Sequence, residues 1–309
     1  MRRNFLILLI GVAVLAPVPF LADNYLLRLA TTALMYASLA LAWNMIGGFA
    51  GYPSFGLAAF FGLGAYATGI LQTRGFPAPL AWMAAVVAGT VFALALGAIV
   101  LRMRGHAFAI TTLVVAEVLR EITNAWNSLT GGGMGINMPF QGIEPIVAAR
   151  FYFFAMLACA ALALAATIII AGSRLGFALR TIKQNEDAAS MVGVNTTKAK
   201  VVAFAVSAGF AAFAGGIYAS WISFIEPTDV YDILFSIKPI VMVLLGGAGT
   251  VFGPIIGAAL FLLLDEIVWR NFLETHTGIL GLVIVLLILY LPTGVSGLSW
   301  LRLGHRPAS

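Results

Sequence analysis

The polar side chains best placed to do chemistry lie in one stretch, residues 173–200. On a helix, one face of this stretch carries a polar row at i, i+3, i+4 and i+7: Arg180, Lys183, Gln184 and Asp187. The opposite face carries an apolar row: Leu175, Leu179 and Ile182. Asn185 is placed to cap a second short helix, which Gly193 would end. Two interpretations stay open, a helix–turn–helix that docks on a soluble partner or an amphipathic helix lying on anionic lipid.

Two glycine-rich interruptions offer backbone N–H groups, which can bind a carboxylate. They span residues 45–51 and 244–249, and each is followed by a helix of small residues. Their likeness indicates a degenerate internal repeat, in which broken segments at matching positions of two halves flank a transport path. The alternative is that the glycines end helices and allow close packing, as the spacing of Gly249, Gly253 and Gly257 permits.

A path along these interruptions would be lined by backbone and by neutral polar side chains. The candidate positions are Asn44, Gly47, Gly48, Gly51, Ser54, Thr111, Thr112, Thr130, Gly132, Gly247, Gly249 and Gly253. Each side chain in this set has an alternative role in packing or in helix capping.

Charges inside apolar runs are costly and therefore informative. Glu117, Arg120 and Glu121 are spaced to pair along one helix face, and so are Glu266 and Arg270. We expect pairing at helix ends. The alternative roles are a charged gate or a contact with a binding protein at the outer face.

The chain lacks the residue patterns of an enzyme. It has neither an H-E-x-x-H motif nor a G-x-x-x-x-G-K-[ST] phosphate loop, and His106, His276 and His305 are too scattered for a metal site. The single cysteine, Cys159, sits in an apolar run as a buried thiol. We predict no catalysis, no metal and no resident cofactor.

Composition predicts the elements that position these residues. Hydrophobic residues make up 61% of the chain and charged residues 9%, and the mean hydropathy is +1.02, values outside those of soluble proteins. Ten apolar runs are visible, at 5–22, 26–47, 54–73, 78–101, 106–123, 150–172, 201–224, 237–248, 251–268 and 276–296. We predict a polytopic all-α transmembrane bundle, one domain over 1–309, with roughly eight to ten spans. Eight would result if 237–268 is a re-entrant hairpin.

The charge distribution predicts how the chain is oriented in the bilayer. The net charge of +5 comes from basic residues between apolar runs, which follow the positive-inside rule and do not indicate a nucleic-acid partner. Both termini, Arg104 and the 173–200 loop are expected in the cytoplasm, and Glu226, Asp229 and Asp232 outside. The first run is expected to be a retained span, because Phe20 fits a signal-peptidase site poorly.

Residues 173–195 read Ser-Arg-x-Gly-x-Ala-Leu-Arg-x-Ile-x-x-Asn-Glu-x-Ala-Ala-x-x-x-Gly-Val-Asn. This pattern resembles the cytoplasmic signature of the branched-chain amino-acid permeases of ABC importers, in particular the LivM-type membrane subunits. Three further blocks agree in order, at 43–59, at 102–110 with 130–136, and at 247–258. The resemblance covers about residues 30 to 295, and four ordered motifs are far more specific than one.

The resemblance implies a bacterial inner-membrane importer built from a second homologous permease, two cytoplasmic ATPases and a periplasmic binding protein. Residues 173–200 would then be the cytoplasmic coupling loop seated on an ATPase, and ATP would be bound by the partners. The coupling residues it implies are Arg174, Gly176, Arg180, Asn185, Glu186, Asp187, Ala188, Ala189 and Gly193.

The substrate implied by the resemblance is a branched-chain or other small amino acid, with urea, short amides and small carboxylic acids as alternatives. A different class, an ion-coupled secondary transporter, would need intramembrane acids, and the centres of the spans carry almost none. The chain departs from the family at residues 51–57, where relatives commonly read Gly-Gln-Leu-Ser-Leu-Gly-His and this chain reads Gly-Tyr-Pro-Ser-Phe-Gly-Leu. That departure leaves the substrate open.

Overall fold

The computed structural model describes residues 2–139, 142 and 144–271, and the single positions 278, 281, 282, 285, 289, 294 and 295. Its long helices are α1 (Arg2–Leu15), α3 (Asn24–Trp43), α4 (Leu57–Thr73), α5 (Ala78–Val100), α6 (Gly105–Ala125), α8 (Pro145–Ala171), α9 (Arg174–Gln184), α11 (Thr196–Ile222), α13 (Leu234–Gly246) and α14 (Gly253–Asn271). The short ones are α2 (Val18–Leu21), α7 (Asn127–Thr130), α10 (Glu186–Met191), α12 (Pro227–Val230), the π-helix η1 (Asn44–Gly48) and the 3-10 helix η2 (Gly132–Met134). Two short strands, β1 (Ile136–Asn137) and β2 (Phe224–Ile225), pair antiparallel. The all-α prediction is confirmed.

Five helical segments within the described residues are long and apolar enough to cross a membrane: Arg2–Leu21, Asn24–Gly48, Ala78–Val100, Pro145–Ala171 and Thr196–Ile222. They match five of the predicted apolar runs. The helix α4 is apolar but shorter, and α6 has spanning length but carries three charged side chains. Most of the run at 276–296 lies outside the described residues, so the number of spans stays a prediction.

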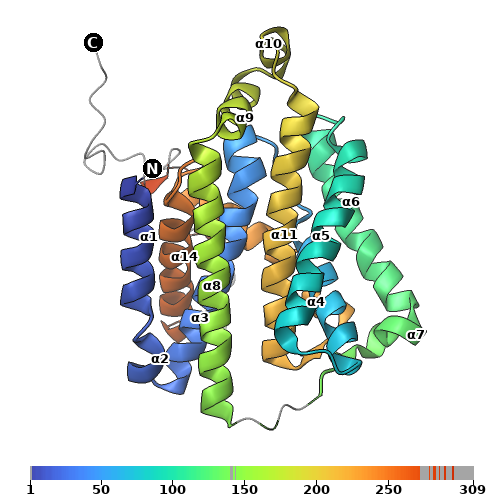
Figure 1. Ribbon diagram of the computed structural model, residues 1–309, viewed down its shortest axis with the longest axis vertical. Coiled ribbons are helices and arrows are strands. Elements are labelled where there is room, and N and C mark those ends of the chain that lie inside the picture. Colours follow the sequence, from blue (N-terminus) through green and yellow to red (C-terminus); the bar gives the residue numbers. More distant parts are fainter. Residues whose placement is uncertain are drawn as a thin grey trace.

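The helix α11 lies at the centre of the bundle and packs against α3, α4, α5 and α8 (Figure 1). Glycines let its backbone approach α4 very closely. A Cβ added at Gly64 would lie 2.1 Å from the carbonyl oxygen of Ala212, and one added at Gly215 would lie 2.0 Å from that of Phe61. The contact between α4 and α11 is therefore one of backbone against backbone.

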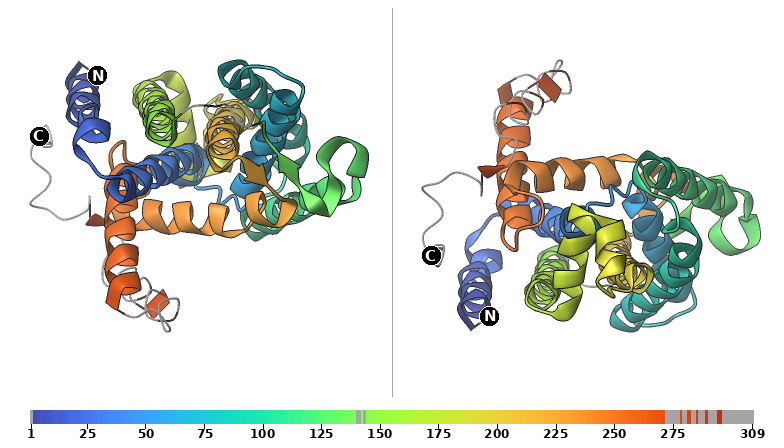
Figure 2. Two further views of the ribbon diagram at one scale, coloured as in Figure 1. Left: turned by 90° about the horizontal axis from the view of Figure 1, so that it is seen from below. Right: turned by 90° about the horizontal axis from the view of Figure 1, so that it is seen from above.

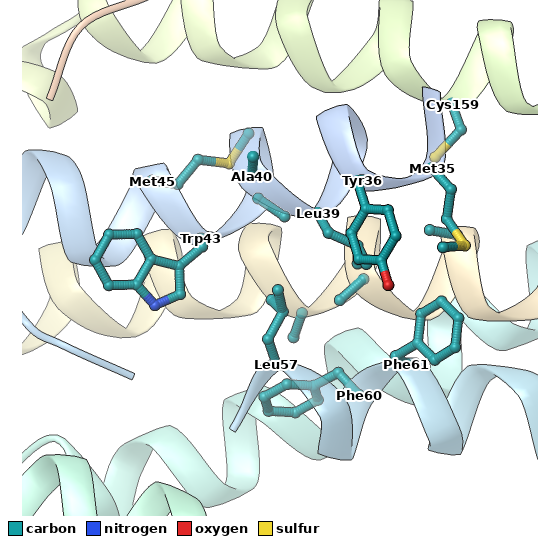
Figure 3. Close-up of a cluster of buried hydrophobic side chains, with 14 of the residues drawn as sticks. Met35, Tyr36, Leu39, Ala40, Trp43, Met45, Leu57, Phe60, Phe61 and Cys159 are labelled. Carbon is teal, nitrogen blue, oxygen red and sulfur yellow. The ribbon is translucent and has the colours of Figure 1, made fainter. Parts of the chain in front are cut away.

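Aromatic and sulfur-containing side chains fill the core beside this contact. Figure 3 shows Leu57 and Phe61 on the side of α4 that faces α3, where Tyr36 and Trp43 lie. The Phe60 ring instead packs edge-on against Phe92 of α5 and Phe204 of α11. The Trp43 indole donates a hydrogen bond of 2.7 Å to the carbonyl oxygen of Ser54. The core thus holds the first glycine-rich interruption between α3 and α4.

The helices α13 and α14 run at a steep angle to the rest. In Figure 2, α8 and α11 are seen nearly end-on, whereas α13 and α14 lie across the view. Their backbones also approach closely, since a Cβ on Gly257 would lie 1.8 Å from the carbonyl oxygen of Met242. The close-packing interpretation of Gly257 in the spaced glycine stripe is therefore confirmed.

The two ends of the bundle differ in charge. The basic Arg104 lies beside α10, with which it forms ion pairs, and the N-terminal end of α1 points toward this same end (Figure 1). From there α11 runs to the opposite end, where β2 and α12 follow with Glu226, Asp229 and Asp232. The two sets of residues thus lie at opposite ends of the bundle, and the assignment of one end to the cytoplasm stays a prediction.

Candidate functional site

The two glycine-rich interruptions, called here the first break (residues 44–56) and the second break (residues 247–252), meet in the structure through one side chain. Asn44 is completely buried. Its Oδ1 accepts a hydrogen bond of 2.8 Å from the backbone N–H of Gly249, and its Nδ2 donates one of 2.9 Å to the carbonyl oxygen of Thr250. Both the oxygen and the nitrogen of the Asn44 amide therefore form hydrogen bonds with the backbone of the second break.

Glycine is required where the two breaks touch. A Cβ on Gly48 would lie 2.7 Å from the backbone nitrogen of Gly249, and one on Gly249 would lie 2.9 Å from the carbonyl oxygen of Gly48. Gly249 also has φ +83°, which side-chain-bearing residues rarely adopt. Asn44 opens a π-helical turn, a feature found often at functional sites.

The segment α9–α10 contacts the first break directly. The Lys183 ammonium donates a hydrogen bond of 2.9 Å to the carbonyl oxygen of Gly48, and a Cβ on Gly51 would lie 3.0 Å from Cγ of Lys183. Sequence reasoning placed Lys183 on a polar helix face but not among the site residues. Only the folded arrangement, which brings residues 135 positions apart together, identifies it.

The predicted helix–turn–helix at 173–193 is present as α9 and α10. Ser173 caps α9, and the Asn185 side chain accepts 3.0 Å hydrogen bonds from the N–H groups of Asp187 and Ala188, as predicted for its cap. Gly193 follows α10 with φ +84°. Gly176 allows α9 to start against the end of α8, because a Cβ there would lie 2.0 Å from the Ile170 carbonyl oxygen.

Side chains of α9 and α10 divide between the bundle and the outside. The predicted apolar face packs inward through Leu179 and Ile182, and Ala189 is also buried. Arg174, Asp187 and Ala188 are exposed, and Arg180 is exposed while donating a 3.0 Å hydrogen bond to the carbonyl oxygen of Ala171.

Large apolar side chains of the α9–α10 segment are exposed as well: Phe177, Met191 at 86% and, directly after α10, Val192 at 74%. The far end of α10 therefore presents an uncovered apolar surface.

A buried ionic cluster joins α10 to the bundle; we call it the Lys200 cluster, formed by Tyr52, Glu186 and Lys200. The Lys200 ammonium, 3% exposed, donates hydrogen bonds to Glu186 Oε1 at 2.6 Å and to the Tyr52 hydroxyl and the Leu101 carbonyl oxygen at 2.9 Å each. The Tyr52 hydroxyl in turn donates to Glu186 Oε2. On the outside, Arg104 pairs with Asp187 at 2.9 Å and with Glu186 at 3.5 Å.

The position of Tyr52 changes the interpretation of residues 51–57, where the chain departs from the common family sequence. Sequence reasoning connected it with the substrate, because it adjoins the first break. In the structure the Tyr52 side chain points to α10 and α11, and its ring stacks edge-on against Phe108 at 5.3 Å. The tyrosine therefore belongs to the contact between the break and the α9–α10 segment.

Glu186 makes the stability of this region depend on pH. Burial raises the pKa of its carboxyl. The hydrogen bonds from Lys200 and Tyr52 and the charges of Lys200 and Arg104 lower the pKa by more than burial raises it, so the folded-state pKa lies below the ordinary value of 4.5. A lowered pKa means that the carboxylate stabilises the folded state above about pH 4.5, and that this contribution is lost as pH falls through the folded-state pKa.

We therefore expect Glu186→Gln to lower the melting temperature by a constant amount between about pH 5.5 and 8, and the difference from wild type to shrink below about pH 4.5. Melting curves of both proteins in detergent check this. Asp187→Gln is the matched control, because that carboxylate is exposed. A Glu186→Gln effect that varies between neutral and mildly alkaline pH contradicts the assignment.

The predicted charge pairs are confirmed. On α6, Arg120 pairs with Glu117 and, at 3.4 Å, with Glu121. On α14, Arg270 pairs with Glu266 at 2.6 Å, and the Tyr25 hydroxyl also donates to this carboxylate. The α6 side chains are between one third and two thirds exposed.

The candidate path residues fall into two groups. Thr112 belongs with the first break, since its hydroxyl accepts a 3.0 Å hydrogen bond from the Phe55 N–H. Thr130 and Gly132 lie beyond the other end of α6, where the Thr130 hydroxyl bonds the Thr123 carbonyl oxygen at 2.6 Å. The remaining positions lie in or beside the two breaks: Gly47, Gly48, Gly51, Ser54, Gly247, Gly249 and Gly253, with Thr111 one residue before Thr112. The path itself stays a prediction.

Comparison with known proteins assigns the family. Residues 25–291 match the family described as branched-chain amino acid transport system / permease component. The permease protein LivM of the high-affinity branched-chain amino acid transport system of Salmonella typhimurium is 29% identical, over 95% of this chain and 75% of its own. The permease protein LsrC of the autoinducer 2 import system of Salmonella paratyphi B is 28% identical, over 69% and 64%.

A solved structure of an inward-facing transporter of the metal-chelate ABC type aligns over 94% of this chain and 99% of its own, with 16% identity and a TM-score of 0.47. The family match covers most of the chain, and it includes both breaks, the Lys200 cluster and the α9–α10 segment. The protein belongs to the family described as branched-chain amino acid transport system / permease component, a family of ABC-transporter membrane subunits.

Proposed function

We propose that this chain is the permease of an ATP-driven importer for branched-chain or other small amino acids, in a bacterial inner membrane with both termini in the cytoplasm. It would act with a second homologous permease, two cytoplasmic ATPases and a periplasmic binding protein. Coupling would use the α9–α10 segment, and the junction of the two breaks would form part of the translocation path.

The observation that carries the proposal is the α9–α10 segment itself. It follows the end of α8, and α10 stands beyond the end of α11 (Figure 1). Capped helix ends hold the segment in shape. It presents Met191 and Val192 uncovered at its tip. Apolar side chains on a rigid projection are suited to fill a groove on a soluble protein, and an ATPase is the soluble partner that a permease of this family requires.

We expect Met191→Asp to weaken association with the ATPases by about tenfold or more, because a charge would replace a large apolar contact in the groove. The fold should be unaffected, since the side chain is 86% exposed. Pull-down of the ATPases by the tagged permease in detergent, with titration of the ATPase, measures the change. Ser190→Asp, at the neighbouring exposed position, is the control. Equal recovery of ATPase by both variants and the wild type contradicts the docking assignment.

The substrate is tested through the binding protein that works with this permease. Calorimetric titration with leucine, isoleucine and valine should show binding, whereas urea, acetamide and autoinducer 2 should not. If the binding protein instead binds only urea, acetamide or autoinducer 2, the permease transports another class of substrate. Uptake into cells should stop on ATP depletion; uptake that survives depletion and follows the proton or sodium gradient would instead support a secondary transporter.

A further inference from the structure

The Lys200 cluster contains a cation in an unusual place. Lys200 lies in the second turn of α11, a helix of membrane-spanning length. Its side chain is 3% exposed, while Lys198, two residues earlier, is exposed. A buried ammonium is tolerated when each N–H has a partner, and Lys200 has three: Glu186, Tyr52 and the Leu101 carbonyl oxygen.

These partners come from separate parts of the chain. Glu186 lies in the first turn of α10, Tyr52 in the first break, and Leu101 directly after α5. The ammonium also lies 4.5 Å from the centre of the Tyr52 ring, in position for a cation–π contact. Lys200 therefore fixes α10, the first break and the end of α5 to one point on α11.

A second contact connects the same elements. Lys183 of α9 bonds the carbonyl oxygen of Gly48, and Gly48 adjoins Gly249 of the second break. The α9–α10 segment is thus attached to the first break at two places, Gly48 and Tyr52. Through Asn44 and Gly48, the first break is in turn attached to the second.

From this arrangement we infer that Lys200, acting through Tyr52 and Glu186, is a positioning residue that makes the glycine breaks follow movements of the α9–α10 segment. The inference rests on the proposed function, since the ATPases would supply the movement. Charge-assisted hydrogen bonds in a buried setting are short and directional. Displacement of α10 would therefore carry Tyr52 with it or break the cluster.

The test uses the complete importer, with its partner permease, ATPases and binding protein, in proteoliposomes. A cysteine is introduced at Ala248, a half-buried position of the second break, and its rate of labelling by a maleimide is measured with and without ATP and vanadate. The natural Cys159 is buried, and its labelling is measured as background in the chain lacking Ala248→Cys. The change in rate on adding nucleotide reports whether the break responds to the ATPases.

We expect Lys200→Met to reduce this nucleotide-dependent change by about tenfold, with the ATPases still bound. Lys198→Met should keep the full response. Tyr52→Phe, which keeps the ring but removes the hydroxyl, should give an intermediate loss. Because Lys200→Met alone leaves the Glu186 carboxylate without its ammonium partner, the neutral pair Lys200→Met with Glu186→Gln is tested alongside it and should also lose the response.

A response in Lys200→Met and in the neutral pair equal to that of the wild type overturns the inference and leaves the proposed function standing. Failure of the wild-type complex itself to bind ATPases, or to respond to nucleotide at residue 248, counts against the proposed function and so also against the inference. A merely structural role of Lys200 would lower ATPase binding and labelling response in proportion, whereas the inference requires the response to fall with binding retained.

Discussion

Asn44→Ala should lower the free energy of unfolding by about 3 kcal/mol, because it empties a completely buried position and leaves the half-buried N–H of Gly249 and carbonyl oxygen of Thr250 without their partner. Transport should fall with it, since the two breaks would no longer be held together. Asn44→Asp should be at least as harmful, because it removes the donated hydrogen bond and places a carboxylate at a completely buried position.

Unfolding of the purified permease in mixed micelles measures the loss. Asn4→Ala, at a half-exposed position on α1, is the control and should change stability by less than about 0.5 kcal/mol. Should Asn44→Ala match that control, the junction of the breaks would not depend on the amide.

Gly64→Ala should destabilise the protein to a similar extent, by about 3 kcal/mol. The new methyl group would lie 2.1 Å from the carbonyl oxygen of Ala212, and relief requires α4 and α11 to move apart. Since the obstacle is backbone, Ala212→Gly should not rescue the variant. Separation of these helices would also loosen the packing of Phe60 and Phe61 in the core.

The same measurement with Gly11→Ala provides the comparison. A Cβ at Gly11 meets nothing within 4 Å, so the substitution should be neutral or stabilise α1 by up to about 1 kcal/mol through helix propensity. Equal effects of the two substitutions would contradict the close approach of α4 and α11.

Local features of this protein were predictable because they depend on short-range spacing. The α9–α10 hairpin, the Asn185 cap and the pairing of Arg120 with Glu117 all join residues within one or two helical turns. The membrane-spanning helices followed from hydrophobic length alone. Periodicity and capping patterns carry this information directly.

The contacts that define the site were not predictable in the same way. Asn44 and Gly249 are 205 residues apart, and Lys200 and Tyr52 are 148 apart. In the sequence Lys200 is one of several basic residues that follow the positive-inside rule, with nothing to distinguish it from Lys198. Its burial results from four segments meeting at one point, and no local pattern specifies such a meeting.

The contact between the two breaks also determines which residues of the second break can change in sequence without loss of that contact. Asn44 recognises only main-chain atoms of residues 249 and 250, so the contact sets no requirement for the side chain of Thr250. A duplicated segment held in this way can change most of its residues and keep its partner, provided that a glycine stays at 249. The internal repeat stays a prediction, and such tolerance is what a repeat whose two copies share little beyond their glycines would require.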